Sequence, residues 1–345
     1  MEHKLLGPLV AGSSLSAIDP NSPVAHPESG RSYIWRYRGA RLDFCVIALR
    51  TGHHMPASTS SPRLRLVRKI ALIGGGGIAA IAVVAIAGIY GVSAWEMSAR
   101  HVVVGPALRV TAAASMAAEG GRLAHVNGCY GCHGDNLAGH LFVDRFYIGR
   151  LSAPNLTRIM PHYGDQQIAD VIREGVRADG TGVVFMPSHA LVRVAVADVA
   201  AMIAHFRTLE PRSDAAQDPS FGPLLRALVV AGALPIEPAV VDRSQLGPSQ
   251  RPAALGPYLA RTTCAMCHGI DLHGETQTES PNRFAVMPAY SLADFKTLLS
   301  TGVAIGGRKL GLMTEMSQSG LKYLRDDEVA ALHAYLSAPE AAAHP

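Results

Sequence analysis

Cysteine is scarce in this chain, with five among 345 residues. Four of the five form two Cys-x-x-Cys-His motifs, at residues 129–133 and 264–268, which leaves only Cys45. A disulfide-stapled fold requires a larger even set of cysteines spread along the chain. No disulfide framework is therefore expected, and the paired cysteines have another role.

Beyond residue 92 the chain has little net charge. Residues 1–92 hold 10 Lys and Arg against 4 Asp and Glu, whereas residues 93–345 hold 21 against 23, a formal charge of −2. Nucleic-acid binding requires a basic patch or stripe. The near-neutral second part therefore argues against a nucleic-acid partner.

Each Cys-x-x-Cys-His motif has the spacing of a covalent haem c site. Two thioether bonds join the cysteine sulfurs to the vinyl groups of the porphyrin, and the next histidine faces the iron as its proximal ligand. Zinc-binding cysteine pairs recur at closer spacing, and thioredoxin-like dithiols need no following histidine. The sequence therefore predicts two covalently bound haem c groups, held by Cys129, Cys132 and His133 and by Cys264, Cys267 and His268.

No charged residue occurs between Ile70 and Val92. As an α-helix this run would span about 35 Å, enough to cross a hydrocarbon core of about 30 Å. By the positive-inside rule, the basic residues at 63, 65, 68 and 69 place the N-terminus in the cytoplasm. We expect residues 63–92 to be a basic flank and one helix in a bacterial inner membrane, with the later residues in the periplasm, where haem thioethers are normally made. A signal peptide cleaved near Ala94 is the alternative, although the run exceeds the usual length of such a segment.

Residues 1–62 are expected to be a disordered extension or a misassigned start. The prolines at 8, 20, 23, 27 and 56 interrupt any helix there, and the apolar run Phe44–Leu49 is too short to span a bilayer. A start at Met55 would place the basic flank close behind the N-terminus, as in an export signal.

The remainder of the chain repeats itself. Pro154-Asn155-x-x-x-x-Met160-Pro161 recurs 127 residues later as Pro281-Asn282-x-x-x-x-Met287-Pro288, and the ungapped match continues to Met186 and Met313. Residues 199–206 then resemble residues 329–336 at an offset of 130. Upstream, Gly121 and Gly256 each stand eight residues before the first cysteine of their motif. A duplicated unit accounts for these matches.

Each unit is predicted to be mainly helical, with one helix leading into the haem motif, a middle helix and a last helix. The middle helices are expected at 166–174 and 292–300, and the last helices at 197–209 and 326–336. The predicted boundaries are a tether at 93–112, a first unit at 113–210, a proline-rich linker at 211–250 and a second unit at 251–340.

The sixth iron ligand separates electron transfer from small-molecule chemistry. In the first unit the candidate is Met186, which precedes a proline in the loop between the middle and last helices. Methionines usually pack in cores, and His162 or His189 could bind instead.

In the second unit three methionines compete. Met287 is excluded because its repeat partner, Met160, lies in the Pro-Asn loop near the proximal side. Met313 lies 11 residues after Gly302, just as Met186 lies 11 after Gly175, whereas counting back from the last helix favours Met316. We expect Met313 to be the ligand, with Met316 as the alternative.

Together with Pro-Asn-Leu-Thr at 154–157 and Leu-Gly-Leu-Met at 310–313, these motifs resemble membrane-anchored dihaem cytochromes c. That family is related to the cytochrome subunits of membrane-bound alcohol and sugar-acid dehydrogenases, and the resemblance covers roughly residues 113–340. It implies a mainly α fold of two tandem cytochrome c domains after an N-terminal transmembrane helix. It also implies that the carbonyl oxygens of Pro154 and Pro281 accept hydrogen bonds from the two proximal histidine rings. Those subunits often carry three haems and a C-terminal anchor, in contrast to this chain.

The expected function is that of an electron carrier with no catalytic residue of its own, passing single electrons from a dehydrogenase or other donor to a respiratory acceptor. A dihaem peroxidase is one alternative, and it would require an iron that opens its sixth site. The other is a dihaem subunit of a dehydrogenase or terminal oxidase complex.

Overall fold

The computed structural model describes residues 33–36, 45–48, 61–111, 113–213, 218–276 and 279–339. The chain divides into two units, Met1–Gly75 and Gly76–Pro345. In the first, β1 (Tyr33–Arg36) and β2 (Cys45–Ala48) pair antiparallel. Most of the extension expected at residues 1–62, including Met55, lies outside the described residues.

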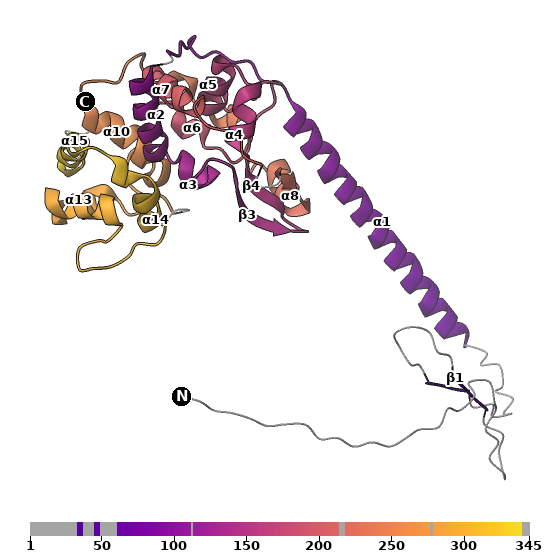
Figure 1. Cartoon of the computed structure of the whole chain (residues 1–345). Helices are drawn as coiled ribbons and strands as arrows, with labels where there is room; N and C mark the ends of the chain where they lie inside the picture. Colours follow the sequence, from indigo (N-terminus) through magenta and orange to yellow (C-terminus); the bar gives the residue numbers. More distant parts are fainter. Residues whose placement is uncertain are drawn as a thin grey trace, which may run out of the picture. The chain divides into compact units, whose positions relative to one another are not determined.

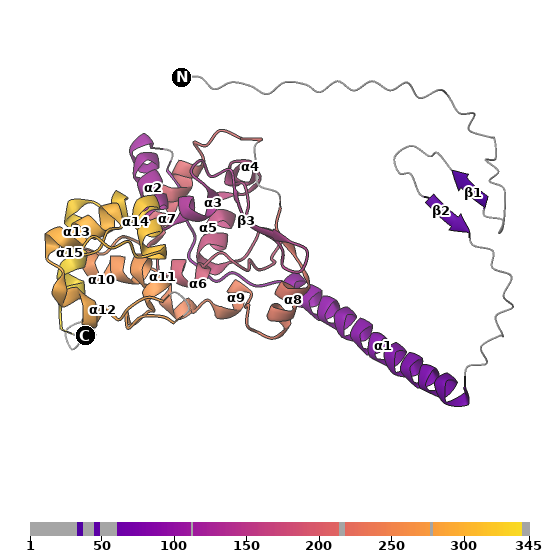
Figure 2. The same cartoon turned by 90° about the horizontal axis from the view of Figure 1, so that it is seen from below.

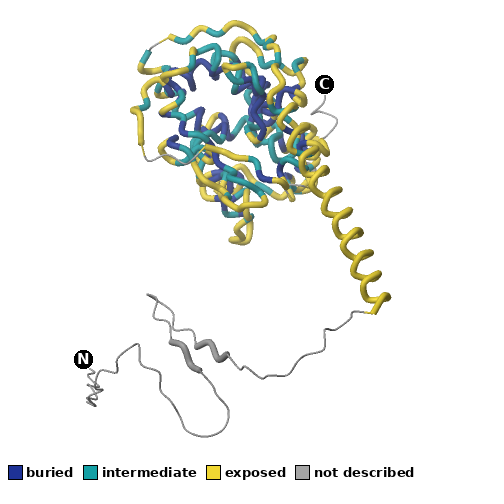
Figure 3. The backbone as a smooth tube through the Cα atoms, turned by 90° about the vertical axis from the view of Figure 1, so that its right-hand side faces the viewer, coloured by how far each residue is buried: buried dark blue, intermediate teal, exposed yellow. Residues whose placement is uncertain are grey.

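Helix α1 (Pro62–Ser98) contains the uncharged run and continues past it to Ser98. By length and composition it can cross a membrane, a test that an export signal also passes. Ser93 is its one buried residue, and Figure 3 shows the rest of the helix in the colours of exposed and half-buried backbone. Little of the apolar surface of this helix is therefore covered by the part of the chain that the structure describes.

The Gly76–Pro345 unit contains two helical lobes that are built alike: lobe 1 (residues 113–213) and lobe 2 (residues 251–339). In lobe 1, α2 (Ala114–Val126) packs against α7 (Val196–Phe206), and in lobe 2, α10 (Leu255–Leu259) packs against α15 (Asp326–Ser337) (Figures 1 and 2). Both pairs form through apolar stripes, with Leu123, Met202 and Phe206 in one core and Leu259, Leu332 and Leu336 in the other.

A glycine lies at each helix crossing. A β-carbon on Gly120 would lie 1.8 Å from the carbonyl oxygen of Ala201, and one on Gly256 would lie 2.4 Å from that of Ala331. Because Ala331 follows Ala201 by the repeat offset of 130, Gly256 corresponds to Gly120 and not to Gly121, which the spacing to the cysteines had favoured. The stretch before the motif differs between the lobes: α2 ends at Val126, two residues before α3, whereas a π-helical turn, η3 (Ala260–Cys264), leads directly into the second motif.

The remaining helices follow in the same order in both lobes. Lobe 1 has α3 (Cys129–His133), α4 (Leu156–Ile159), η1 (Met160–His162), α5 (Asp165–Glu174) and α6 (Ser188–Leu191). Lobe 2 has α11 (Ala265–His268), α12 (Arg283–Val286), η4 (Met287–Ala289), α13 (Leu292–Thr301), α14 (Leu312–Ser319) and η5 (Leu321–Tyr323). The predicted middle and last helices are confirmed as α5, α13, α7 and α15, with ends shifted by at most three residues.

Backbone details repeat at the offset of 127 as well. An isolated bridge joins Val176 to Gly182 in lobe 1, and another joins Val303 to Lys309 in lobe 2. The lobes differ between the haem motif and the Pro-Asn loop, where lobe 1 has eight more residues. The longer segment of lobe 1 contains a hairpin of β3 (His140–Arg145) and β4 (Gly149–Ala153), with β5 (Ser220–Phe221) paired to β4. The sequence had not indicated these strands.

The segments predicted as tether and linker both pack on lobe 1. The backbone N–H groups of Val104 and Gly105 donate to the carboxylate of Glu174, which is 1 % exposed and also binds Arg243 Nε at 2.9 Å. Arg243 belongs to η2 (Arg243–Gln245) in the linker, after α8 (Pro223–Val230) and α9 (Glu237–Val240). A buried carboxylate requires such partners, so Glu174 joins both segments to α5.

Candidate functional site

Each predicted haem motif forms a short helix that ends at a glycine. In lobe 1, α3 ends at Gly134 with φ of 81°, and in lobe 2, α11 ends at Gly269 with φ of 76°. Residues other than glycine rarely adopt this backbone conformation. The glycine after each histidine therefore lets the chain turn away directly behind the ring.

The two histidine rings are held in one tautomer by backbone carbonyls. Nδ1 of His133 lies 2.9 Å from the carbonyl oxygen of Pro154, and Nδ1 of His268 lies 3.3 Å from that of Pro281, as the resemblance implied. A carbonyl oxygen only accepts, so Nδ1 carries the proton and Nε2 keeps its lone pair. Burial lowers the pKa of both histidines, and the hydrogen bond partly offsets this effect. A neutral imidazole with a free Nε2 is the form that binds a metal ion.

Within the part of the chain that the structure describes, the four motif cysteines form no disulfide bond. Burial raises the pKa of Cys129 and of Cys264 to about 12, and burial also raises the pKa of Cys132 and Cys267. Redox dithiols have lowered thiol pKa values because the thiolate is the reactive species. The raised pKa values argue against a reactive redox dithiol at either motif.

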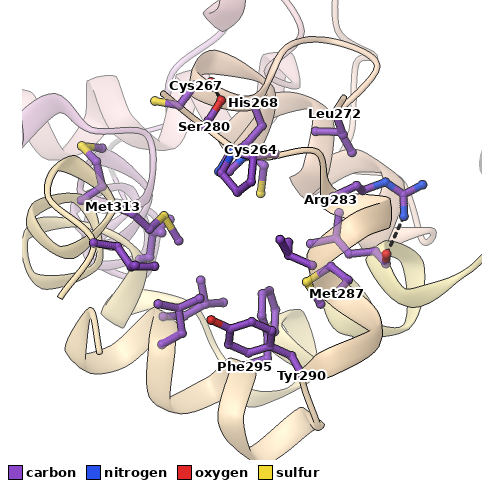
Figure 4. Close-up of a pocket in the computed structure, with 18 of the residues that line it drawn as sticks. Cys264, Cys267, His268, Leu272, Ser280, Arg283, Met287, Tyr290, Phe295 and Met313 are labelled. Carbon is purple, nitrogen blue, oxygen red and sulfur yellow. Dashed lines mark hydrogen bonds between the residues drawn. The ribbon is translucent and has the colours of Figure 1, made fainter. Parts of the chain in front are cut away.

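Lobe 2 contains a cavity of about 1080 Å³ beside its motif (Figure 4). Cys264, Cys267 and His268 line it together with apolar side chains such as Phe295 and Leu332. Its volume is slightly above the roughly 300–1000 Å³ typical of ligand and cofactor pockets, so a large cofactor fits. Attachment cysteines, an oriented histidine and an apolar wall fit a covalently bound haem.

Both candidate methionines of lobe 2 line this cavity, and both come from α14. Met313 packs against the core of lobe 2. The methyl group of Met316 instead lies 3.6 Å from the position that a β-carbon on Gly128 of lobe 1 would take. Met316 therefore also reaches the interface between the lobes. Met287, excluded from the repeat, is buried in the lobe 2 core at the same cavity.

In lobe 1, Met186 is half-buried and packs against the core that contains Leu123 and Met202. The two competing histidines have other surroundings. His189 pairs through Nδ1 with the carboxylate of Glu237 at 2.9 Å, and His162 is exposed.

The first motif lies directly beside the second cavity. Val126 and Asn127, just before Cys129, form part of the cavity wall in lobe 2. In the opposite direction, Met266, between Cys264 and Cys267, packs against the core of lobe 1. Sequence reasoning treated the units separately and could not find these contacts.

A reciprocal set of polar contacts joins the lobes. Arg122 of α2 binds Glu328 of α15 at 2.7 Å, while Tyr258 of α10 donates to Asp198 of α7 at 2.7 Å. Asp198 and Glu328 are the third residues of their helices and stand 130 positions apart, so each lobe contributes the equivalent acid. Arg251 binds both acids, at 2.9 and 2.6 Å. In the sequence, an acidic residue at the same place in the last helix of both units was the signal that could have revealed this network.

A three-ring stack crosses the same interface. The ring of His125 lies between Tyr130 and Tyr323, with centroid distances of 3.7 and 3.9 Å. Tyr130 is the residue after the first attachment cysteine, and Tyr323 belongs to η5 of lobe 2. The interface therefore includes Tyr130, a residue of the first predicted haem motif.

An oriented histidine, two half-buried thiols and an apolar cavity define lobe 2 as a site for covalently attached haem. Comparison with known families gives the same answer, because residues 253–338 match the cytochrome c family. No curated protein matches the chain. The chain thus carries a cytochrome c domain, which implies bound haem c and a role in haem-based electron transfer.

Proposed function

We propose that the chain is a dihaem c-type cytochrome in which lobe 1 is a second cytochrome c domain, and that it relays single electrons between a donor and an acceptor protein. The contact between a proximal histidine and a proline carbonyl, present in both lobes, carries this proposal. The shared helix order and the glycine crossings support it further. A bound haem c supplies the one-electron couple, and the protein sets its potential through ligands, burial and hydrogen bonds.

The axial ligands in this proposal are His133 with Met186 and His268 with Met313. The exposure of His162 and the pairing of His189 with Glu237 support the methionine in lobe 1. The core packing of Met313 supports it over Met316, whose methyl group approaches Gly128. Methionine at both irons favours electron transfer, because neither site then stays open for substrate.

The chain's own residues favour transfer between the two sites. Val126 and Asn127 form a wall of the second cavity only a few bonds from Cys129, so one short segment separates the sites. The reciprocal polar contacts of Arg122, Tyr258 and Arg251 hold the lobes in this arrangement. A fixed short separation suits a relay of electrons within the chain.

In the same proposal α1 is a single crossing of a bacterial inner membrane, with the N-terminus in the cytoplasm and the lobes in the periplasm. Its length and apolar composition, and the basic flank before it, support this topology. The partners are then a dehydrogenase or other donor and a respiratory acceptor. The formal charge of −2 over residues 93–345 supports protein partners over nucleic acid.

Counting haems tests the proposal. Purified protein should give two covalent haems per chain in a pyridine haemochrome assay. Replacing Cys129 and Cys132 by alanine should remove one haem, and the same change at Cys264 and Cys267 should remove the other. A Cys45→Ala control should keep both. One haem in the wild-type protein would show that lobe 1 is not a haem domain.

A further inference from the structure

Large apolar side chains are exposed on the β3–β4 hairpin and on α8, next to lobe 1. Phe146, in the hairpin turn, is 91 % exposed. We call the group the apolar patch, and its members are Leu141, Phe142, Phe146, Tyr147, Leu224, Leu228 and Val230. Surface turns normally carry small or polar residues, so Phe146-Tyr147-Ile148 at a turn indicates a surface that is covered by something else.

Hydrogen bonds hold the two parts of the patch together. The backbone N–H of Leu224 donates to the carbonyl of Tyr147 at 2.9 Å, and that of Gly222 donates to the carbonyl of Ile148 at 2.8 Å. Helix α8 is apolar on both sides: Leu225 and Val229 are buried, whereas Leu224 and Leu228 are exposed. One side of this short helix packs on the protein, and the apolar residues on the other side are available to contact a second apolar surface.

The covering surface is indicated by α1. Arg226 of α8 donates to Ser93 Oγ at 2.9 Å, and its guanidinium carbon lies 4.7 Å from the centre of the Tyr90 ring. Figures 1 and 2 both show α8 beside the end of α1 that leads into lobe 1. Tyr90 and Trp95 stand where the uncharged run of α1 ends, the position of interfacial aromatic residues in membrane helices.

We propose that the apolar patch inserts into the outer headgroup and upper acyl region of the lipid bilayer that α1 crosses. The inference rests on the membrane crossing proposed above and adds a second contact with the same membrane. Two contacts at different points fix the orientation of the lobes on the bilayer. The cofactor sites would then face their partners at a constant height, instead of moving freely on a single anchor.

Depth-dependent fluorescence quenching tests this inference in the full-length, haem-loaded protein reconstituted into liposomes. A Phe146→Cys variant, with Cys45 replaced by serine, carries a thiol-reactive fluorophore. The matched control is Leu292→Cys on α13 of lobe 2, a leucine that is 46 % exposed. Comparing lipids brominated in the acyl chains with unbrominated lipids cancels quenching by haem.

We expect the brominated lipid to quench the label at 146 and to leave the label at 292 unchanged, while the protein resists an alkaline carbonate wash. If brominated lipid changes the emission of the label at 146 no more than that of the label at 292, in protein that resists the wash, the insertion is overturned and the α1 crossing stands. Release by the wash would overturn both. If the label at 146 is unquenched in liposomes but shielded in native membranes, the patch binds a protein partner and the lipid assignment is wrong.

Discussion

Replacing Glu328 tests whether the polar network holds the lobes together. This side chain is fully buried and accepts hydrogen bonds from Arg122 at 2.7 Å, from Arg251 at 2.6 Å and from the backbone N–H of Arg325 at 2.9 Å. A Glu328→Gln change keeps the shape but removes the charge and turns an amide donor toward an arginine. Breaking a buried ion pair from one side costs about 3–5 kcal/mol. Arg122 keeps Glu119 and Arg251 keeps Asp198, so we expect about 3 kcal/mol.

That loss should lower the thermal midpoint by about 6–12 °C at pH 7, since about 1 kcal/mol shifts a domain of this size by about 2–4 °C. The measurement is far-UV circular dichroism of the haem-loaded chain in detergent. Glu119→Gln is the control, because its side chain is 35 % exposed and such a pair contributes at most about 1 kcal/mol.

The difference between the wild type and Glu328→Gln should also depend on pH. Burial alone would raise the pKa of Glu328, but the hydrogen bonds from Arg122 and from the backbone of Arg325 lower it below the usual value. A carboxylate with a lowered folded pKa stabilises the protein above its unfolded pKa of about 4.3, and the effect is lost as the pH falls through the folded value. The two midpoints should therefore converge in acid. A shift no larger than that of Glu119→Gln, or a gap that persists in strong acid, would refute the reasoning.

Three further outcomes are expected. Met313→Ala should abolish one methionine-to-iron charge-transfer band, lower the potential of that haem and open its iron to carbon monoxide, whereas Met316→Ala should have none of these effects. A wild-type protein that already binds carbon monoxide would contradict the ligand assignment. Gly120→Ala should lower the free energy of unfolding by about 3 kcal/mol or more, because the added β-carbon meets backbone. Gly121→Ala should cost less, because its β-carbon meets only the His205 ring. Equal losses in denaturant titrations would restore the register that the cysteine spacing suggested. The hydrogen bond to Glu237 raises the pKa of His189. The stability that this pair contributes is therefore complete below the unfolded pKa of about 6.5 and disappears as the pH rises through the folded pKa. A His189→Gln variant whose stability has the same pH profile as the wild type would exclude this contribution.

Local chemistry explains which features could be read from the sequence. A haem attachment motif must be contiguous because two thioethers and one ligand bind a single cofactor face, so Cys129–His133 and Cys264–His268 are visible without a fold. The helices α5, α7, α13 and α15 follow from apolar periodicity, and α5 and α13 also end at a glycine. The uncharged run in α1 is likewise a property of composition alone.

Contacts between distant segments depended on the tertiary structure. The correspondence of Gly256 with Gly120 follows from their close approach to the carbonyl groups of Ala331 and Ala201, which the spacing to the cysteines does not reveal. Met313 and Met316 lie one turn apart on α14, and counting from the middle helix favours the first whereas counting from the last helix favours the second. Only the tertiary structure shows that Met313 packs in the lobe 2 core while Met316 approaches Gly128 of lobe 1.

The sequence by itself therefore determined the cofactor chemistry, the repeat and the apolar helix, because each depends on residues that are neighbours along the chain. Only the tertiary structure decided that Asn127 lines the cavity of the other lobe, that Arg122 and Glu328 join the lobes, and that α8 lies against the end of α1. Those features arise from residues more than a hundred positions apart in the chain. Their contacts form because burying apolar surface and pairing buried charges lowers the free energy of the whole fold.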